Sequence, residues 1–211
     1  MTRRARTPLD PSTLVVRKGS VLGALPPPRL PGSPVELGRM TAWIVAEVGS
    51  ATTRRVYHVR ASDGAEYALK ECYDHEILDK EERRTTKLAS RVTTCPAIGG
   101  IARVMQTGPG WLLREWIAGP TGAEWLERRT AETHADVLQS ENDAQRERLL
   151  RGLHRALAEL NLYVARLTPE NLVSHSGPWH IVDCGKVRET SEAQALERYR
   201  TKLAARWGIK L

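Results

Sequence analysis

The chain has 211 residues, enough to bury a sizeable core, with a formal net charge of +7 and three cysteines. Residues 1–35 hold six basic residues and one acidic residue, +5 of this total, so the rest is close to neutral, which argues against nucleic-acid binding as the main function. The cysteine spacing indicates a reduced compartment and no zinc site, and no apolar run approaches the ~20 residues that span a bilayer. We expect a cytoplasmic protein with no membrane span, with non-classical secretion as an alternative.

Residues 1–37 are rich in proline and arginine, and their few apolar residues are not spaced for a helix or a strand. We expect a flexible basic tail here, with a short edge strand over residues 13–16 as an alternative. From Ala42 onward, alternating apolar and polar residues predict a small antiparallel sheet with a turn at Ser62-Asp63-Gly64. Its three strands are expected at residues 43–48, 55–60 and 66–70.

Helical patterns dominate the second half of the chain. A charged helix is expected over residues 77–92, followed by an irregular passage and a strand over residues 111–117. A long helix from about Asp143 carries one apolar stripe, formed by Leu149, Leu150, Leu153, Leu157 and Leu160. A small hairpin around residues 176–178 and a last helix from about Ser191 complete an α+β fold.

The pattern that points to function lies at residues 166–173, which read R-L-T-P-E-N-L-V, and at residues 181–185, which read I-V-D-C-G. The pair resembles the catalytic loop and the metal-binding segment of protein kinases, which read H-R-D-L-K-P-E-N-L and D-F-G. This resemblance implies that Asn171 and Asp183 are magnesium ligands, because a short strand and a tight turn bring the two segments together.

Several positions depart from the kinase pattern, since Val164-Ala165-Arg166 stands where the family reads H-R-D. Arg166 stands where the family carries its catalytic aspartate, and a cation cannot accept the proton of a substrate hydroxyl. Positioning and electrostatics supply most of the catalysis of phosphoryl transfer, so the loss of this base need not abolish turnover. Arg166 is then a candidate to stabilise charge on the transferred phosphoryl group, and Glu170 to orient a hydroxyl. Thr168 replaces the lysine of the loop, and Cys184 replaces the phenylalanine of D-F-G.

A glycine-rich phosphate loop would lie between the first two strands, where the family reads G-x-G-x-x-G-x-V. Only Gly49 and Val56 match, because Ala51 and Arg54 replace the second and third glycines. Arg54 or Arg55 is a candidate to contact phosphate instead, and an ordinary hairpin connection is the alternative.

The resemblance also implies a lysine that binds the nucleotide phosphates and a glutamate that orients it. The run Y-A-L-K ending at Lys70 is similar to the V-A-I-K strand, whose lysine pairs with nucleotide phosphates and is oriented by a glutamate of the next helix. We name Glu81 as that partner, with Glu82 and Glu76 as the runners-up and an ordinary solvated helix as the alternative.

The strand over residues 111–117 resembles the hinge that joins the lobes of small bacterial kinases. The resemblance implies that the backbone of Glu115, Trp116 and Ile117 offers hydrogen bonds to adenine. A core strand is the alternative.

Residues 42–211 together resemble the minimal, atypical bacterial kinases, among them the lipopolysaccharide-kinase, RIO-like and Bud-type groups and the PhoP-network kinase-like proteins, whose catalytic loop can also lack the aspartate. The resemblance implies a two-lobed fold: a tail over residues 1–37, a small antiparallel β-sheet lobe over 38–118 and a reduced helical lobe over 119–211. The 26 residues after Gly185 are too few for the activation segment and peptide-binding helices of large protein kinases.

The expected function is an ATP- and magnesium-dependent phosphotransferase of serine/threonine type, acting on a protein or a small hydroxyl compound. The alternative is a pseudokinase that serves as a protein-interaction module or a secreted effector scaffold. Arg166 favours the pseudokinase, whereas the survival of Lys70, Asn171 and Asp183 favours the enzyme. A third interpretation, an RNA-associated protein, requires the tail to bind nucleic acid with a steep dependence on salt.

Overall fold

The computed structural model describes residues 16–17, 20–21, 27–51, 54–92, 95–131, 137–174 and 177–209. The chain divides into two compact units, a first one of Met1–Leu78 with Gln106–Leu113 and a second one of Asp79–Met105 with Arg114–Leu211. The domain boundaries expected from the sequence stay a prediction.

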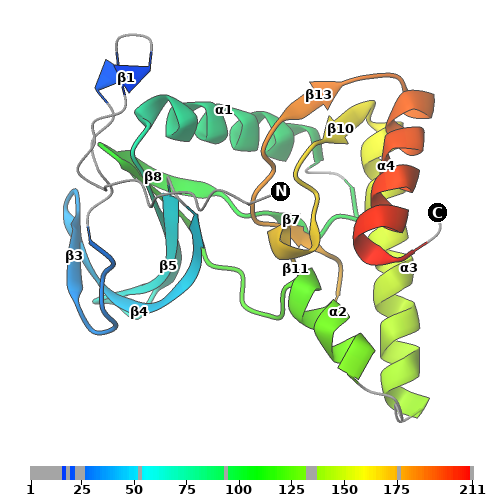
Figure 1. Cartoon of the computed structure of the whole chain (residues 1–211), viewed down its shortest axis with the longest axis horizontal. Helices are drawn as coiled ribbons and strands as arrows, with labels where there is room; N and C mark the ends of the chain where they lie inside the picture. The colour runs from blue at the N-terminus through cyan, green and yellow to red at the C-terminus, as the bar shows by residue number, and fades with distance from the viewer. Residues whose placement is uncertain are drawn as a thin grey trace, which may run out of the picture. The chain divides into compact units, whose positions relative to one another are not determined.

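The first unit is built on a curled sheet with the strand order β3-β4-β5-β6-β9-β8 (Figure 1). The pairs from β3 to β6 are antiparallel, and the turn after β5 has Gly64 at a φ of +85° and an Asp63 carboxylate that accepts from the Ala65 N–H at 2.9 Å. The predicted turn and strand pairing are thereby confirmed. The strands are β3 (Pro34–Leu37), β4 (Met40–Ala51), β5 (Arg54–Ala61), β6 (Glu66–Cys72), β8 (Val104–Gly108) and β9 (Trp111–Glu115).

Alternation along the strands builds the core of this sheet. In β4, Ala42 and Ile44 are buried, whereas Trp43 between them is 40% exposed. The same period of two buries Tyr57 and Val59 in β5. The full cluster consists of Val35, Leu37, Ala42, Ile44, Tyr57, Val59, Leu69 and Leu113.

The sheet also includes Pro34–Leu37, which lie within the range 1–37 that we expected to be a flexible tail. Strand β3 pairs with β4, and its Val35 and Leu37 are buried. These two apolar residues at alternate positions suffice for an edge strand, which tolerates a proline at its first position. Further upstream, Arg29 binds the Glu71 carboxylate at 2.8 Å. The expected strand over 13–16 lies outside the described residues apart from Val16, which belongs to the small pair β1 (Val16–Arg17) and β2 (Ser20–Val21).

The second unit holds most of the helical structure. Helix α1 (His75–Val92) begins in the first unit and continues into the second, and α3 and α4 pack against each other (Figure 1). The predicted leucine stripe is confirmed in α3, where Leu150, Leu153 and Leu157 are buried. The other helices are α2 (Gly122–Ala131), α3 (Val137–Glu159), the short 3-10 turn η1 (Pro169–Asn171) and α4 (Glu192–Trp207).

Short strands connect these helices. The predicted hairpin is present as the antiparallel pair of β11 and β12, and β12 also pairs with β7 in parallel. Strand β10 pairs with β13. The bounds are β7 (Gly100–Ile101), β10 (Leu162–Val164), β11 (Leu172–Val173), β12 (His180–Ile181) and β13 (Val187–Glu189). Among the described helices, none is long and apolar enough to cross a membrane.

A buried histidine of α3 should make the free energy of unfolding depend on pH. His154 is fully buried, its Nδ1 lies 2.8 Å from the Leu150 carbonyl oxygen, and burial lowers the pKa of its ring from 6.5 to about 4. The unfolded chain therefore binds one more proton than the folded chain between these two pKa values, so stability is lost as the pH falls through this window. From pH ~7.5 to ~5 we expect His154 to lower the free energy of unfolding by about 2 kcal/mol.

Urea denaturation of the wild type and of His154→Phe across this range measures the effect. The aromatic variant keeps the edge contact with Tyr199, whose ring centroid lies 4.9 Å from that of His154, but it cannot take up a proton. Equal losses of stability in both proteins would contradict the assignment.

Candidate functional site

The loop that follows β10 is shaped by alternating buried and exposed residues. Leu167 and Leu172 are fully buried and Pro169 is buried, whereas Arg166 and Glu170 are exposed. Proline suits the first position of a helical turn because its missing N–H is not needed there. The apolar residues thus hold the loop against the core of the second unit, and its charged residues face outward.

Asn171 stabilises this loop through both N–H groups of its side-chain amide. Its Nδ2 donates to the Arg166 carbonyl oxygen at 2.9 Å and to Thr168 Oγ1 at 3.1 Å. Its own carbonyl oxygen accepts from the Val182 N–H at 3.0 Å, which connects the loop to the segment after β12. Because both amide protons are engaged, Oδ1 is the side-chain atom of Asn171 that is left to accept a hydrogen bond or to ligate a cation.

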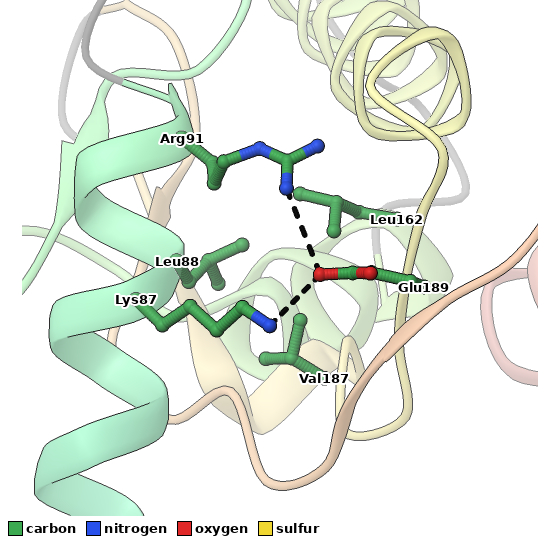
Figure 2. Close-up of a pocket in the computed structure, with 6 residues that line it drawn as sticks. All are labelled: Lys87, Leu88, Arg91, Leu162, Val187 and Glu189. Carbon is green, nitrogen blue, oxygen red and sulfur yellow. Dashed lines mark hydrogen bonds and ion pairs between the residues drawn. The ribbon is translucent and has the colours of Figure 1, made fainter.

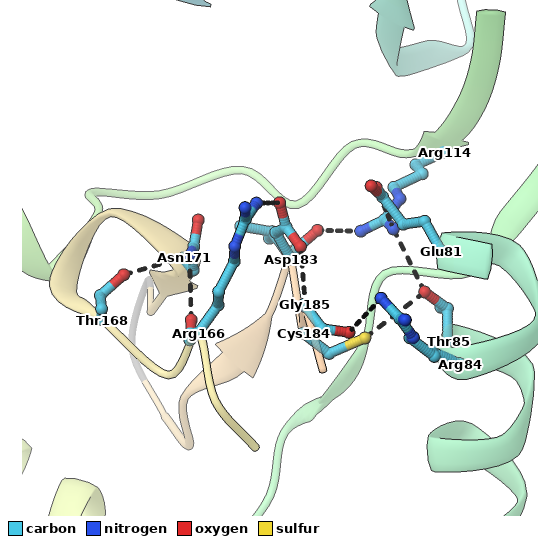
Figure 3. A network of polar contacts seen from close by, with 11 residues as sticks. Glu81, Arg84, Thr85, Arg114, Arg166, Thr168, Asn171, Asp183, Cys184 and Gly185 are labelled. Carbon is cyan, nitrogen blue, oxygen red and sulfur yellow. Dashed lines mark hydrogen bonds and ion pairs between the residues drawn. The ribbon is translucent and has the colours of Figure 1, made fainter. Parts of the chain in front are cut away.

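Asp183 and Arg166 face each other across these two segments (Figure 3). Asp183 Oδ2 lies 3.6 Å from Arg166 Nη1, and Asp183 Oδ1 accepts from the Gly185 N–H at 3.0 Å. Gly185 has a φ of +54°, and a Cβ there would lie 2.5 Å from Arg166 Cγ. Glycine at this position therefore both permits the backbone conformation and leaves room for the arginine side chain.

A second, buried network adjoins Asp183 through the backbone of the same segment. Arg114 of β9 donates to Glu81 of α1 at 2.6 Å and to Thr85 Oγ1 at 3.1 Å, and its other terminal nitrogen donates to the Val182 carbonyl oxygen (Figure 3). Thr85 Oγ1 also lies 3.7 Å from the sulfur of Cys184. Arg114 therefore joins α1 to the segment that carries Asp183.

Cys184 occupies the core position where the kinase motif has phenylalanine. The side chain is buried, and burial raises the pKa of the Cys184 thiol. Such a thiol is inert as a nucleophile, because the thiolate is the reactive form. Cys184 therefore serves as a small apolar residue here.

Helix α4 holds the strand that leads into the loop. Tyr199 accepts from the Val164 N–H at 2.8 Å and donates to the Leu162 carbonyl oxygen at 3.0 Å, and burial raises the pKa of its phenol. Lys202 Nζ donates to the Ala165 carbonyl oxygen at 2.6 Å and to that of Val164 at 3.2 Å. Burial, followed by the charge of Arg206, lowers the pKa of Lys202 to about 8. The backbone on both sides of Val164 is thus fixed by side chains of one helix.

A small cavity of about 220 Å³ lies between α1 and the β10–β13 pair (Figure 2). Glu189 Oε1 lies 2.8 Å from Lys87 Nζ and 3.7 Å from Arg91 Nη1, and the hydrogen bond from Lys87, aided by both charges, lowers the pKa of Glu189. Exposed ion pairs of this kind contribute little free energy. The charges of this cavity pair with one another, and none of its lining residues belongs to the two segments of the kinase-like pattern, so it is a weaker candidate than the loop around Arg166. Its lining consists of Lys87, Leu88, Arg91, Leu162, Val187 and Glu189.

In the first unit, the predicted phosphate loop is a hairpin. Gly49 pairs with Val56, and Ala51 pairs with Arg54, so β4 and β5 continue through this segment apart from residues 52–53, which lie outside the described residues. Val56 pairs in turn with Lys70 on β6. Gly49 and Lys70 are therefore in register on either side of β5, and their contact with phosphate stays a prediction.

The remaining predicted residues have defined places. Lys70 in the first unit and Glu81 in the second are each 5% exposed, and their pairing stays a prediction. The Glu115 N–H donates to the Arg103 carbonyl oxygen at 2.9 Å, and the side chains of Trp116 and Ile117 are half-buried just beyond β9. The backbone role expected for these three residues stays a prediction.

Sequence reasoning missed Arg114 as part of the site. Its signal was present in the run W-L-L-R-E-W-I, because a charge inside an otherwise apolar strand needs a buried partner. The identity of that partner, Glu81, comes from another element and is visible only in the structure.

No family model matches the sequence, and no curated protein matches it. Solved structures do match. The BubR1 kinase domain is 14% identical with a TM-score of 0.56, over 76% of this chain and 51% of that one. A complex of Rv3197 with erythromycin from Mycobacterium tuberculosis is 19% identical with a TM-score of 0.50, over 69% and 46%. The chain therefore has a kinase-like fold and spans about half the length of these two structures.

Two side chains of these segments carry oxygen atoms of the kind that magnesium binds. Asp183 offers a carboxylate and Asn171 an amide oxygen, both hard oxygen donors. The described residues contain no group of three or more histidine, cysteine, aspartate and glutamate side chains that could hold a metal ion. Magnesium commonly takes one or two protein carboxylates and completes its shell with water and substrate phosphates. The two oxygen donors fit a magnesium ion that takes the rest of its shell from other ligands.

Proposed function

We propose that this chain is an ATP- and magnesium-binding protein of the minimal, atypical bacterial kinase kind, with two lobes and phosphotransferase activity on a protein or a small hydroxyl compound. The observation that carries the proposal is the arrangement of Asn171 and Asp183 on a kinase-like fold. The two residues come from segments joined by the Val182–Asn171 hydrogen bond at 3.0 Å, and each carries a side-chain oxygen of the kind that ligates magnesium.

Each residue of the proposed site has a distinct task. Lys70 supplies a cation for the phosphates, Glu81 orients it, and Gly49 lets the backbone approach. The backbone of Glu115, Trp116 and Ile117 binds the adenine ring, as in the resemblance given by the sequence. When bound, magnesium would neutralise charge on the phosphates, with Asn171 and Asp183 as its protein ligands.

Two residues of the loop replace the missing catalytic aspartate in this proposal. Arg166 is half-exposed and presents a charge beside Asp183, where it stabilises negative charge that develops on a phosphoryl group. Glu170 is exposed on the same loop and orients the accepting hydroxyl. Since positioning and electrostatics supply most of the catalysis in this class of reaction, turnover without the aspartate is slow rather than absent.

A pseudokinase is the second candidate function, and the contact between Arg166 and Asp183 favours it. A guanidinium 3.6 Å from the proposed metal ligand competes with a metal ion for the same carboxylate. In this case the chain binds nucleotide and works as a protein-interaction module, in the cytoplasm or as a secreted effector.

Magnesium-ATP is expected to raise the melting temperature of the protein. A ligand that binds only the folded state stabilises it by about 2.7 kcal/mol at a hundredfold excess over Kd, which corresponds to a shift of several degrees. Differential scanning fluorimetry of the wild type and Lys70→Ala measures the shift, which we expect to disappear in the variant. Lys87→Ala, which removes a 61% exposed lysine, is the matched control and keeps the shift. An unchanged melting temperature of the wild type at millimolar nucleotide would refute the proposal.

Labelled ATP then separates the two candidate functions. If the wild type transfers labelled phosphate to a protein or a small hydroxyl compound and Asp183→Asn does not, the chain is an enzyme. Nucleotide binding without any incorporation identifies a pseudokinase.

A further inference from the structure

The carboxylate of Asp183 already has a cation beside it. Arg166 Nη1 lies 3.6 Å from Asp183 Oδ2, and the side chains of the two residues are 48% and 15% exposed (Figure 3). The pair comes from the two segments that carry the kinase-like pattern. The two opposite charges are therefore close enough to form an ion pair that joins these segments.

The place of Arg166 is determined by its neighbours. Its carbonyl oxygen accepts from Asn171 Nδ2 at 2.9 Å, which fixes the backbone from which the side chain leaves. Its aliphatic stem lies over Gly185, where a Cβ would come within 2.5 Å of Cγ, 2.6 Å of Cδ and 2.9 Å of Cβ of the arginine. Both proposed metal ligands and the glycine of the second segment thus help to hold this one side chain.

This arrangement changes what the site attracts. A divalent cation that approaches a bare carboxylate gains from its full negative charge, whereas one that approaches the Arg166–Asp183 pair is repelled by the guanidinium. A phosphate group has the opposite preference. Arginine presents five N–H donors in a planar fork that matches phosphate oxygens, and the half-exposed side chain of Arg166 leaves part of that fork in solvent.

We infer that Arg166 is a built-in cation that binds nucleotide phosphates directly and makes nucleotide binding largely independent of magnesium. This inference rests on the proposed nucleotide binding and adds to it the form of the ligand, a nucleoside di- or triphosphate without its metal ion. Arg166 supplies the positive charge that a magnesium ion would otherwise bring to the phosphates, and the Asn171 amide fixes the backbone of Arg166.

Isothermal titration calorimetry with ATP, in excess EDTA and in excess magnesium, tests the inference. We expect the wild type to bind with affinities that agree within about threefold in the two conditions. Arg166→Gln should lose roughly tenfold or more in EDTA, as expected for a charged hydrogen bond, and should recover most of this loss when magnesium is present. Arg166→Lys keeps the charge without the planar fork and should fall between them.

The control is Arg188→Gln, which removes one exposed arginine from β13 of the same unit. It should bind like the wild type in both conditions, so that an effect of net charge alone is excluded. A wild type that binds tenfold or more tightly with magnesium, or a ratio of affinities that is unchanged by Arg166→Gln, overturns the inference while the proposed function stands. Absence of binding by every variant in both conditions overturns the proposed function itself.

Discussion

Replacement of Arg114 by leucine is expected to lower the free energy of unfolding by about 3 to 5 kcal/mol, because it breaks a buried ion pair from one side. The side chains of Arg114 and Glu81 are only 5% and 7% exposed, and their closest atoms are 2.6 Å apart. The variant also withdraws the donors to Thr85 and to the Val182 carbonyl oxygen. Urea denaturation followed by circular dichroism measures the loss.

Two comparisons show whether the loss comes from this pair. Arg200→Leu removes an arginine from an exposed pair with Glu197, whose side chains are 62% and 66% exposed, and should cost less than about 1 kcal/mol. The double variant Arg114→Leu with Glu81→Leu replaces both charges by apolar groups and should be more stable than Arg114→Leu alone. An Arg114 variant that is no less stable than the Arg200 variant would contradict the role of the buried pair.

Removal of Trp179 by substitution with alanine is expected to destabilise the protein by about 3 to 5 kcal/mol, as for other large aromatic residues of protein cores. Trp179 is 1% exposed and packs with Trp125 and Trp207, at centroid distances of 5.8 and 5.7 Å. Its indole N–H also donates to the Arg146 carbonyl oxygen at 3.1 Å, and alanine leaves that bond unmade. Chemical denaturation, with tryptophan fluorescence as a second probe, follows the change.

The matched control is Trp43→Ala, since Trp43 is 40% exposed and should lose less than about 1 kcal/mol. Gly122 gives a second check on the same cluster. A Cβ at that position would lie 2.3 Å from the Trp207 ring, so Gly122→Ala should destabilise the wild type, and the smaller ring of Trp207→Phe should reduce this penalty. Equal costs of Trp179→Ala and Trp43→Ala would show that the aromatic cluster does not stabilise the core.

The elements that could be predicted from the sequence are those with a local signal. The turn at Gly64, the leucine stripe of α3 and the hairpin of β11 and β12 each follow from residues close together in the chain. The capped start of α4 is equally local, because the Ser191 side chain accepts from the Gln194 N–H. The kinase-like fold was inferred from the two motif segments and is supported by solved structures.

What could not be predicted depends on pairings between distant segments. The partner of Glu81 lies 33 residues away, and the partner of the Arg166 side chain belongs to another strand connection. Charged residues are frequent in α1, so its sequence cannot say which glutamate is buried. Strand β3 was missed because the prolines around it concealed the alternation of Val35 and Leu37. The roles of Lys70 and of the adenine-binding backbone stay predictions.

The contacts of Tyr199 and Lys202 with β10 give the last helix a task beyond filling the core. Both residues come after the final motif, yet they grip the backbone immediately before Arg166. A truncated protein that ends soon after Gly185 would keep both segments of the kinase-like pattern. It would lose the hydrogen bonds from α4 that hold the backbone before Arg166. Such fragments therefore do not reproduce the loop of the intact protein. A molecule that displaces α4 would change the conformation of this loop without contacting Arg166 itself.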